Sequence, residues 1–174
     1  SKEPISLLAL EGAKSYCMEL NSLSKSYNMP GWRVGMLCGH QEYLKQVIKV
    51  KSNMDSGMFL GIQEGAIAAL QLPPKWFEKL NRKYSRRREL VWEIVDFIGA
   101  IYDKESSGMF VWAKLPKEED SKEYVDRLLI EKHIFIAPGD IFGSNGQGYI
   151  RFSLCVKKKL IQKALHRLKN PSYL

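Results

Sequence analysis

Residues 21–35 read Asn21-Ser22-Leu23-Ser24-Lys25-Ser26-Tyr27-Asn28-Met29-Pro30-Gly31-Trp32-Arg33-Val34-Gly35. Largely apolar runs at residues 16–20 and 34–38 flank this stretch and predict two strands joined by a loop. A loop between strands is where a rigid scaffold commonly displays chemistry. The side chains of this loop are therefore the first candidates for a functional site.

The loop places a lysine among groups that bind phosphate. A partly desolvated lysine has a lowered pKa and presents a neutral amine that can attack a carbonyl. The hydroxyls of Ser22 and Ser24 and the guanidinium of Arg33 are suited to holding a phosphate. Pyridoxal phosphate needs such a set, because it carries both an aldehyde and a phosphate. Spacing alone leaves a second interpretation open, in which Lys25 is an ordinary solvated loop lysine.

The pattern Ser22-x-Ser24-Lys25-x-x-Asn28-Met29-x-Gly31-Trp32-Arg33-x-Gly35 resembles the lysine motif of the class I/II, fold type I pyridoxal-phosphate-dependent aminotransferases. The resemblance implies that Lys25 forms the Schiff base with pyridoxal phosphate and shuttles a proton in the reaction. It implies that Ser22 and Arg33 hold the phosphate, with Ser24 a weaker candidate. The implied reaction transfers an amino group between an amino acid and a 2-oxo acid. Substrates of the aspartate, alanine or diaminopimelate type are favoured.

Two alternatives remain open. A carbon–sulfur lyase or a synthase of the same fold has a similar lysine loop. A regulatory domain could use the fold without chemistry, although the presence of both Lys25 and Arg33 argues against this alternative.

The resemblance covers nearly the whole chain and predicts its organisation. The implied fold class is α/β and α+β, as the C-terminal portion of the pyridoxal-phosphate-dependent transferase fold. Residues 1–75 would be the end of the large cofactor domain, residues 76–101 a connecting helix, and residues 102–174 a small C-terminal domain. Because only 24 residues precede Lys25, we expect a longer parent protein. The groups that pair with the cofactor ring belong to the N-terminal part of the family, so the fragment alone is expected to be inactive.

Apolar periodicity predicts the remaining elements. Residues recurring at helical spacing predict helices at 41–51, 58–72 and 73–99, a shorter helix that begins with Ser121 as its N-cap, and a closing helix at 157–168. Strands are predicted at 108–115, 134–137 and 149–156. The glycine-rich stretch at 139–148 is predicted to be a turn or hairpin loop without a phosphate site.

Arg151 stands out because apolar residues flank it within a predicted strand. A buried guanidinium needs an anionic partner, since an unpaired buried charge is costly. A structural carboxylate and a solvent-facing position are the ordinary explanations. The family resemblance implies a third, in which Arg151 binds the substrate carboxylate with its planar fork.

Composition excludes several classes of function. The net charge of +8 comes mainly from helical stretches, and the basic run at residues 82–88 is interpreted as a solvated helix face rather than a nucleic-acid surface. The three cysteines are scattered without metal-ligand spacing and are expected to be buried, reduced thiols. No apolar run has the length of a membrane span, so a cytoplasmic location is expected. The resemblance also implies a homodimer in the full-length parent, with residues 53–59 near its interface.

Overall fold

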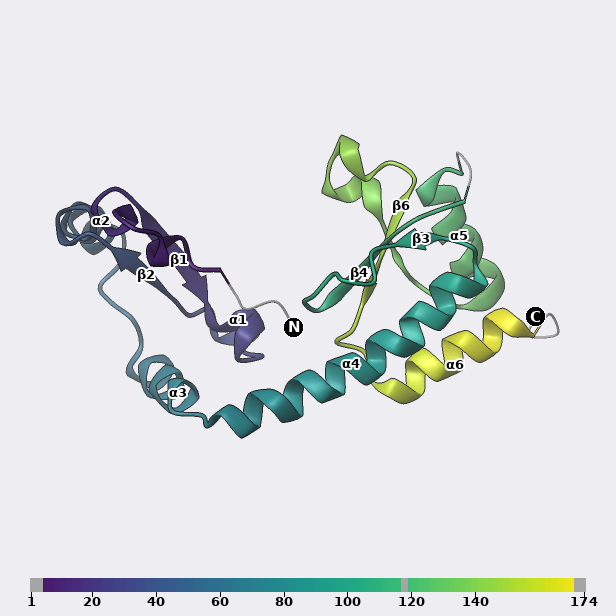
Figure 1. The fold of residues 1–174 in the computed structure, drawn as a ribbon, viewed down its shortest axis with the longest axis horizontal. Coiled ribbons are helices and arrows are strands. Elements are labelled where there is room, and N and C mark those ends of the chain that lie inside the picture. The colour runs from purple at the N-terminus through teal and green to yellow at the C-terminus, as the bar shows by residue number, and fades with distance from the viewer. Residues whose placement is uncertain (1–4, 117–118, 171–174) are drawn as a thin grey trace. The chain divides into compact units, whose positions relative to one another are not determined.

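The computed structural model describes residues 5–116 and 119–170 (Figure 1). The contacts divide the chain into two compact units, Ser1–Pro73 and Pro74–Leu174. Each unit is described by itself below. The assignment of residues 1–75, 76–101 and 102–174 to a large domain, a connecting helix and a small domain stays a prediction.

Two antiparallel strands carry the lysine segment in unit 1. β1 (Met18–Ser22) pairs with β2 (Gly35–Gly39), and Ser22 lies opposite Gly35. Both predicted strands are confirmed, with a shift of two residues for β1 and one for β2. Two helices follow along the chain, namely α2 (Gln41–Met54) and α3 (Leu60–Leu70). These two predicted helices are also confirmed, with α2 longer and α3 shorter than expected.

Unit 1 has little core of its own. Among its described residues, the buried apolar side chains are Leu23, Val34 and Ala69. The helix α2 has an apolar stripe but no buried residue. Large apolar side chains are exposed throughout the unit, among them Leu20, Ile48, Met54, Phe59 and Leu60. The residues that the structure describes therefore leave much of the apolar surface of unit 1 uncovered.

Unit 2 begins with one long helix, α4 (Pro74–Phe97). Proline is tolerated at its first position because the first N–H groups of a helix have no partner within it. The buried residues of α4 are Tyr84, Val91, Ile94 and Val95, whose spacing places them on one face. The prediction of a single long amphipathic helix is confirmed.

The basic run of α4 is not wholly solvated, contrary to the prediction. Arg87 Nη1 donates to the Leu154 carbonyl at 2.8 Å, and Arg88 Nη1 donates to the Ser106 carbonyl at 3.0 Å. Both arginine side chains are half-buried. The prediction was wrong for these two residues because carbonyl groups distant in the sequence lie within their reach.

Four antiparallel strands form the sheet of unit 2, in the order β3-β4-β6-β5. Their bounds are Ile101–Tyr102 for β3, Phe110–Lys114 for β4, Ala137–Pro138 for β5 and Tyr149–Ser153 for β6. The strand β3 was not predicted. The strand expected at 134–137 is shifted, and Pro138 lies inside β5 rather than ending it. Proline is accepted there because β5 is an edge strand, where a missing N–H leaves no ladder partner unsatisfied.

The two faces of this sheet have different environments. Side chains alternate between the faces along a strand. One face contributes buried side chains to a cluster shared with α4, α5 (Ser121–Lys132) and α6 (Lys158–Lys169), so these helices cover it (Figure 1). The strand residues on that covered face are Val111, Ala113, Ile150 and Phe152. The alternate residues, on the face away from the helices, are Phe110, Trp112, Lys114, Tyr149, Arg151 and Ser153.

The cysteines are less buried than predicted. Cys17 is half-buried, while Cys38 and Cys155 are exposed, and all three are free thiols. Cys38 lies in β2, a strand without a buried residue, and Cys155 lies in the turn after β6. Within the described ranges, no group of three or more His, Cys, Asp or Glu side chains is placed to hold a metal ion. None of the helices described there combines the length and apolar composition needed to cross a bilayer.

Candidate functional site

Lys25 lies in a helical turn rather than in the predicted loop. The chain leaves β1 and forms the short helix α1 (Leu23–Ser26) before turning back to β2. The Leu23 N–H donates to the Val34 carbonyl at 3.1 Å, which holds the two ends of the segment together. The motif is therefore displayed at the end of a closed hairpin.

Ser22 begins this turn and keeps a donor for a ligand. Its Oγ accepts a hydrogen bond from the Ser24 backbone N–H at 3.2 Å, which is the usual bond of an N-cap serine. A hydroxyl that accepts one bond still has its own proton to donate. The Ser22 side chain is exposed, whereas Ser24 is only 7% exposed, so Ser22 is the more accessible of the two serines.

The Lys25 side chain is exposed. The desolvation expected from the sequence is therefore not supplied by the residues that the structure describes. Ser22 is the N-cap of α1, and Lys25 lies three residues after it within that helical turn. The amine and the serine hydroxyl are thus presented by the same turn.

Arg33 has an uncommon backbone conformation for a residue other than glycine. It follows the 3-10 helix Pro30–Trp32, and its φ of 51° lies in the left-handed region. Arg33 Nη1 donates to the Pro30 carbonyl at 3.0 Å, which leaves its other N–H groups to bind an anion. Its neighbour Trp32 packs on α3, where a Cβ at Gly65 would clash with the indole ring. The contact anchors the segment that carries Arg33.

These residues fit pyridoxal phosphate in the chemistry of their donors. Ser22 and Arg33 supply a hydroxyl and a guanidinium, which are both donors to a phosphate ester. Lys25 supplies an exposed amine, which could react with an aldehyde. All three come from a single segment closed by the pairing of β1 with β2. The roles of Ser22, Ser24, Lys25 and Arg33 stay predictions from the resemblance.

Arg151 belongs to unit 2 and lies on the face of the sheet away from the helices. Its guanidinium carbon lies 4.3 Å from the centre of the Phe110 ring and 4.0 Å from the centre of the Phe142 ring. In the described part of the chain, no carboxylate forms an ion pair with it. The side chain is half-buried. A structural carboxylate partner is thus not found there, and Arg151 remains a candidate for binding an external anion.

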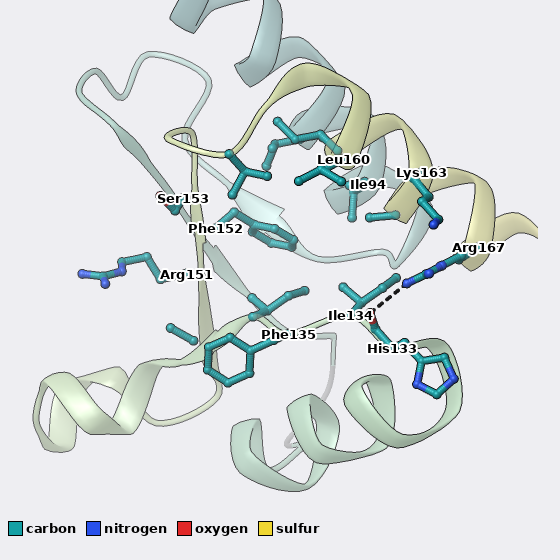
Figure 2. A pocket seen from close by; sticks show the side chains of 16 residues that line it. Ile94, His133, Ile134, Phe135, Arg151, Phe152, Ser153, Leu160, Lys163 and Arg167 are labelled. Carbon is teal, nitrogen blue, oxygen red and sulfur yellow. Dashed lines mark hydrogen bonds between the residues drawn. The ribbon is translucent and has the colours of Figure 1, made fainter. Parts of the chain in front are cut away.

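Behind this face, a largely apolar cavity of about 490 Å³ lies between α6 and the segment that leads into β5 (Figure 2). Ile134, Phe152 and Leu160 are among the residues that line it. Figure 2 shows that the Arg151 side chain, which also borders the cavity, points away from these three. The cavity and the guanidinium of Arg151 are therefore separate features.

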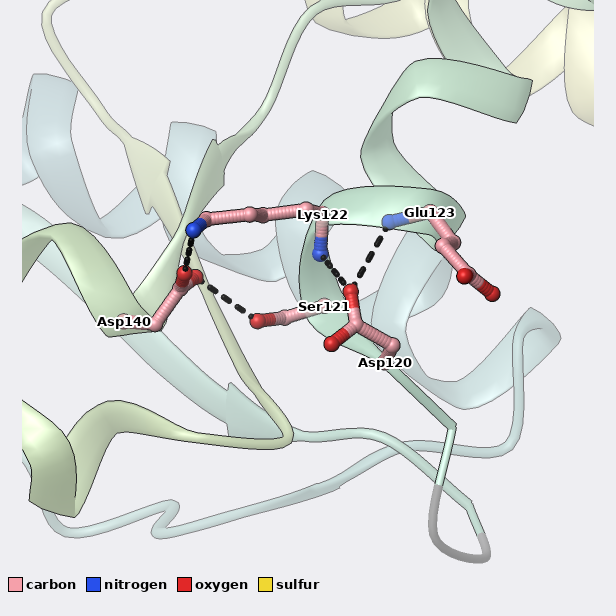
Figure 3. Close-up of polar contacts among 5 residues, drawn as sticks. All are labelled: Asp120, Ser121, Lys122, Glu123 and Asp140. Carbon is pink, nitrogen blue, oxygen red and sulfur yellow. Dashed lines mark hydrogen bonds and ion pairs between the residues drawn. The ribbon is translucent and has the colours of Figure 1, made fainter.

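A polar network fixes the turn that carries Phe142, and the sequence did not predict it. Asp140 accepts a hydrogen bond from the Ser121 hydroxyl at 3.0 Å and pairs with Lys122 Nζ at 2.9 Å (Figure 3). The N-cap of α5 is Asp120, whose carboxylate accepts from the N–H groups of Lys122 and Glu123. The prediction of Ser121 as the N-cap was therefore wrong. Ser121 is instead buried and donates across to Asp140, a contact that only the tertiary structure creates.

Replacing Ser121 by alanine is expected to destabilise the protein by about 1 kcal/mol, because its partly buried hydrogen bond to Asp140 is lost. Thermal unfolding of the complete protein measures the effect. Ser107→Ala is the matched control, since Ser107 is an exposed serine of the same unit. Equal unfolding midpoints for Ser121→Ala and the wild type would show that the bond contributes nothing.

The same network predicts a pH dependence. Lys122 lowers the pKa of Asp140 from its usual 3.8, and Ser121 lowers it further, while desolvation opposes both. A carboxyl with a lowered pKa in the folded state stabilises the protein above its unfolded pKa. That stabilisation is lost as the pH falls below 3.8 towards the folded value. Asp140→Asn should therefore unfold at a lower temperature than the wild type at pH 7. The difference should shrink below pH 3.8, and a difference independent of pH would contradict the assignment.

The comparisons with known proteins agree on one family. A family model described as Aminotransferase class I and II matches residues 1–168. A protein of Aquifex aeolicus named LL-diaminopimelate aminotransferase is 40% identical over 169 residues, which are 97% of this chain and 44% of that protein. A protein of the same name from Maridesulfovibrio salexigens is 39% identical, over 96% of this chain and 43% of that protein. The chain thus spans less than half the length of these relatives.

Solved structures show the same fold. The probable N-succinyldiaminopimelate aminotransferase of Thermus thermophilus matches with a TM-score of 0.87 and 32% identity. The match covers 97% of this chain and 45% of that chain. The predicted fold class is confirmed at this level, as a mixed α/β fold shared with part of the aminotransferase structures.

Proposed function

The chain belongs to the aminotransferase class I and II family, and we propose that the complete protein transfers amino groups between an amino acid and a 2-oxo acid with Lys25 at the reacting centre. The observation that carries this proposal is the placement of Ser22, Lys25 and Arg33 on one closed hairpin segment. The segment combines the exposed Lys25 with two side chains, Ser22 and Arg33, that can donate hydrogen bonds to a phosphate. Neither a lyase nor a regulatory domain has a specific observation in its favour.

In the proposed reaction, four residues of this chain act. Pyridoxal phosphate, when bound, supplies an aldehyde and an electron-withdrawing ring. Ser22 and Arg33 would hold the phosphate of the cofactor, and the Arg33 guanidinium would pair with its negative charge. The Lys25 amine takes a proton from the Cα of the donor amino acid as a general base. In the second half of the reaction it gives a proton, as a general acid, to the carbon of the 2-oxo acid that becomes the new Cα. Arg151 binds the substrate carboxylate, which orients the Cα–H bond.

The relatives direct the choice of substrate. Both LL-diaminopimelate aminotransferases named above match almost the whole of this chain, so we propose LL-diaminopimelate as the amino donor. Aspartate and alanine are the other donors to test, because the sequence favours them too. A cytoplasmic location and a homodimer stay predictions; the exposed Met54 and Phe59, in the stretch expected at the dimer interface, support the homodimer. Sedimentation of the complete protein as a monomer would contradict the homodimer.

Product analysis of the complete protein tests the reaction class. Incubation with pyridoxal phosphate, LL-diaminopimelate and 2-oxoglutarate is expected to form glutamate in step with the loss of the donor. Omitting 2-oxoglutarate should stop turnover after one donor molecule per active site, because the amino group then has no acceptor. Continued release of ammonia without 2-oxoglutarate would indicate a lyase. Turnover of aspartate or alanine alone would correct the substrate and leave the aminotransferase assignment standing.

A further inference from the structure

We propose that Phe110 and Phe142 are positioning residues that hold the Arg151 guanidinium ready for the substrate carboxylate. The inference rests on the proposed function, because it deepens the role of Arg151. The guanidinium carbon lies 4.3 Å from one ring centre and 4.0 Å from the other, both well within the distance of a cation–π contact. Two aromatic rings thus contact one cation.

The two rings reach Arg151 from different parts of unit 2. Phe110 comes from β4, whose pairing with β6 places Trp112 opposite Arg151 and Phe110 opposite Ser153. Phe110 is therefore a diagonal neighbour of Arg151 on the same face of the sheet. Phe142 comes from the 3-10 helix Gly139–Phe142, which lies outside the sheet.

The position of Phe142 is itself fixed by its surroundings. Asp140, two residues before it, is bonded to Ser121 and Lys122 of α5. The Trp112 ring meets the Phe142 ring edge-on, with 5.8 Å between the ring centres, and the Trp112 ring also stacks on the Tyr149 ring. The turn is also tightly closed, because a Cβ at Gly146 would clash with the backbone of Gly139. The turn, its network and its aromatic neighbours hold Phe142 beside Arg151.

This arrangement prepares Arg151 for an anion. Aromatic faces attract a guanidinium without accepting its N–H groups in the way that a carboxylate does. In the described part of the chain, the Arg151 guanidinium has no ion-pair partner and no hydrogen-bond acceptor, so its fork is available to a ligand. A long side chain that is already held in place loses less conformational freedom when the carboxylate binds. The two rings therefore increase the affinity for carboxylate ligands through Arg151.

The test uses the complete protein with Phe142→Leu and Phe110→Leu, which keep apolar bulk and remove the aromatic face. Each change is expected to raise KM for the amino acid about threefold to tenfold and to leave kcat nearly unchanged. The dissociation constant of propionate, measured by calorimetry, should rise by the same factor. The rate with an amine that lacks the carboxylate should not change. Phe142→Tyr, which restores an aromatic face, should bind propionate as the wild type does.

The control variant is Phe135→Leu, because Phe135 is an exposed phenylalanine of the same unit, and the cation–π contacts of Arg151 within the described residues are with Phe110 and Phe142 instead. The role of the rings would be overturned if the dissociation constant of propionate were unchanged in Phe142→Leu but raised in Arg151→Lys. That result would leave the proposed function standing. An equal loss of rate with the carboxylate-free amine would also overturn the role of the rings, by indicating a general structural effect. A wild type that neither binds propionate nor transfers amino groups would refute the proposed function as well.

Discussion

Replacing Lys25 by alanine in the complete protein is expected to lower amino transfer by at least about a thousandfold, because one residue would supply both the nucleophile and the proton carrier. Alanine has neither a nucleophile nor a titratable group. Lys25 is an exposed residue at the turn after β1, so the substitution should leave the hairpin itself intact. Steady-state rates and the absorption spectrum with pyridoxal phosphate measure the effect. The wild type should show the imine absorption band, and the variant should lack it.

Lys25→Arg is the control for charge. Arginine keeps the positive charge but remains protonated in proteins, so it cannot act as the nucleophile. Both variants should lose the covalent adduct that borohydride forms on Lys25 of the wild type, as detected by mass spectrometry. An adduct on a different lysine, or equal activity in Lys25→Ala and the wild type, would contradict the assignment.

Removing the guanidinium of Arg151 is the second change with a large expected effect. Arg151→Ala should raise KM for the amino acid by about a hundredfold, because truncating one partner of a hydrogen-bonded charge pair costs about 2–5 kcal/mol. Arg151→Lys should raise it by about tenfold, since lysine keeps the charge but not the bidentate fork. KM for the 2-oxo acid should rise with that for the amino acid, because both substrates carry the same carboxylate.

Lys114→Ala provides the matched control for Arg151. Lys114 lies on the same face of the sheet, and its amine lies 6.0 Å from the centre of the Tyr149 ring. The substitution removes one positive charge from this face and leaves the bidentate guanidinium of Arg151 in place. Equal increases in KM for Lys114→Ala and Arg151→Ala would indicate that general charge, rather than a specific contact, attracts the substrate.

Local sequence signals predicted most of the helices and strands. The long helix α4 was predicted from its apolar spacing, and the pair β1 and β2 from the runs on either side of the lysine motif. The short strands were less predictable. β3 has two residues, which is too few for a periodic pattern to emerge. The position of β5 depended on its place at the edge of the sheet, where Pro138 is accepted.

The candidate site, like the fold, was predicted only in part from the sequence. Ser22, Ser24, Lys25 and Arg33 lie within one short motif, so their residue types and spacing were sufficient to propose them. Arg151 was identified as an arginine among apolar neighbours, but its aromatic contacts were not. The register of β4 against β6 brings Phe110 to it, and the turn held by Asp140 brings Phe142.

The amino-acid sequence by itself determined the family, the reacting lysine to propose and the order of the main helices and strands. These depend on motifs and on periodicity along a continuous stretch of chain. Only the tertiary structure decided which partners Arg87, Arg88, Ser121 and Arg151 have. Those contacts join residues far apart in the sequence, and they depend on strand register and helix packing, which no local pattern specifies.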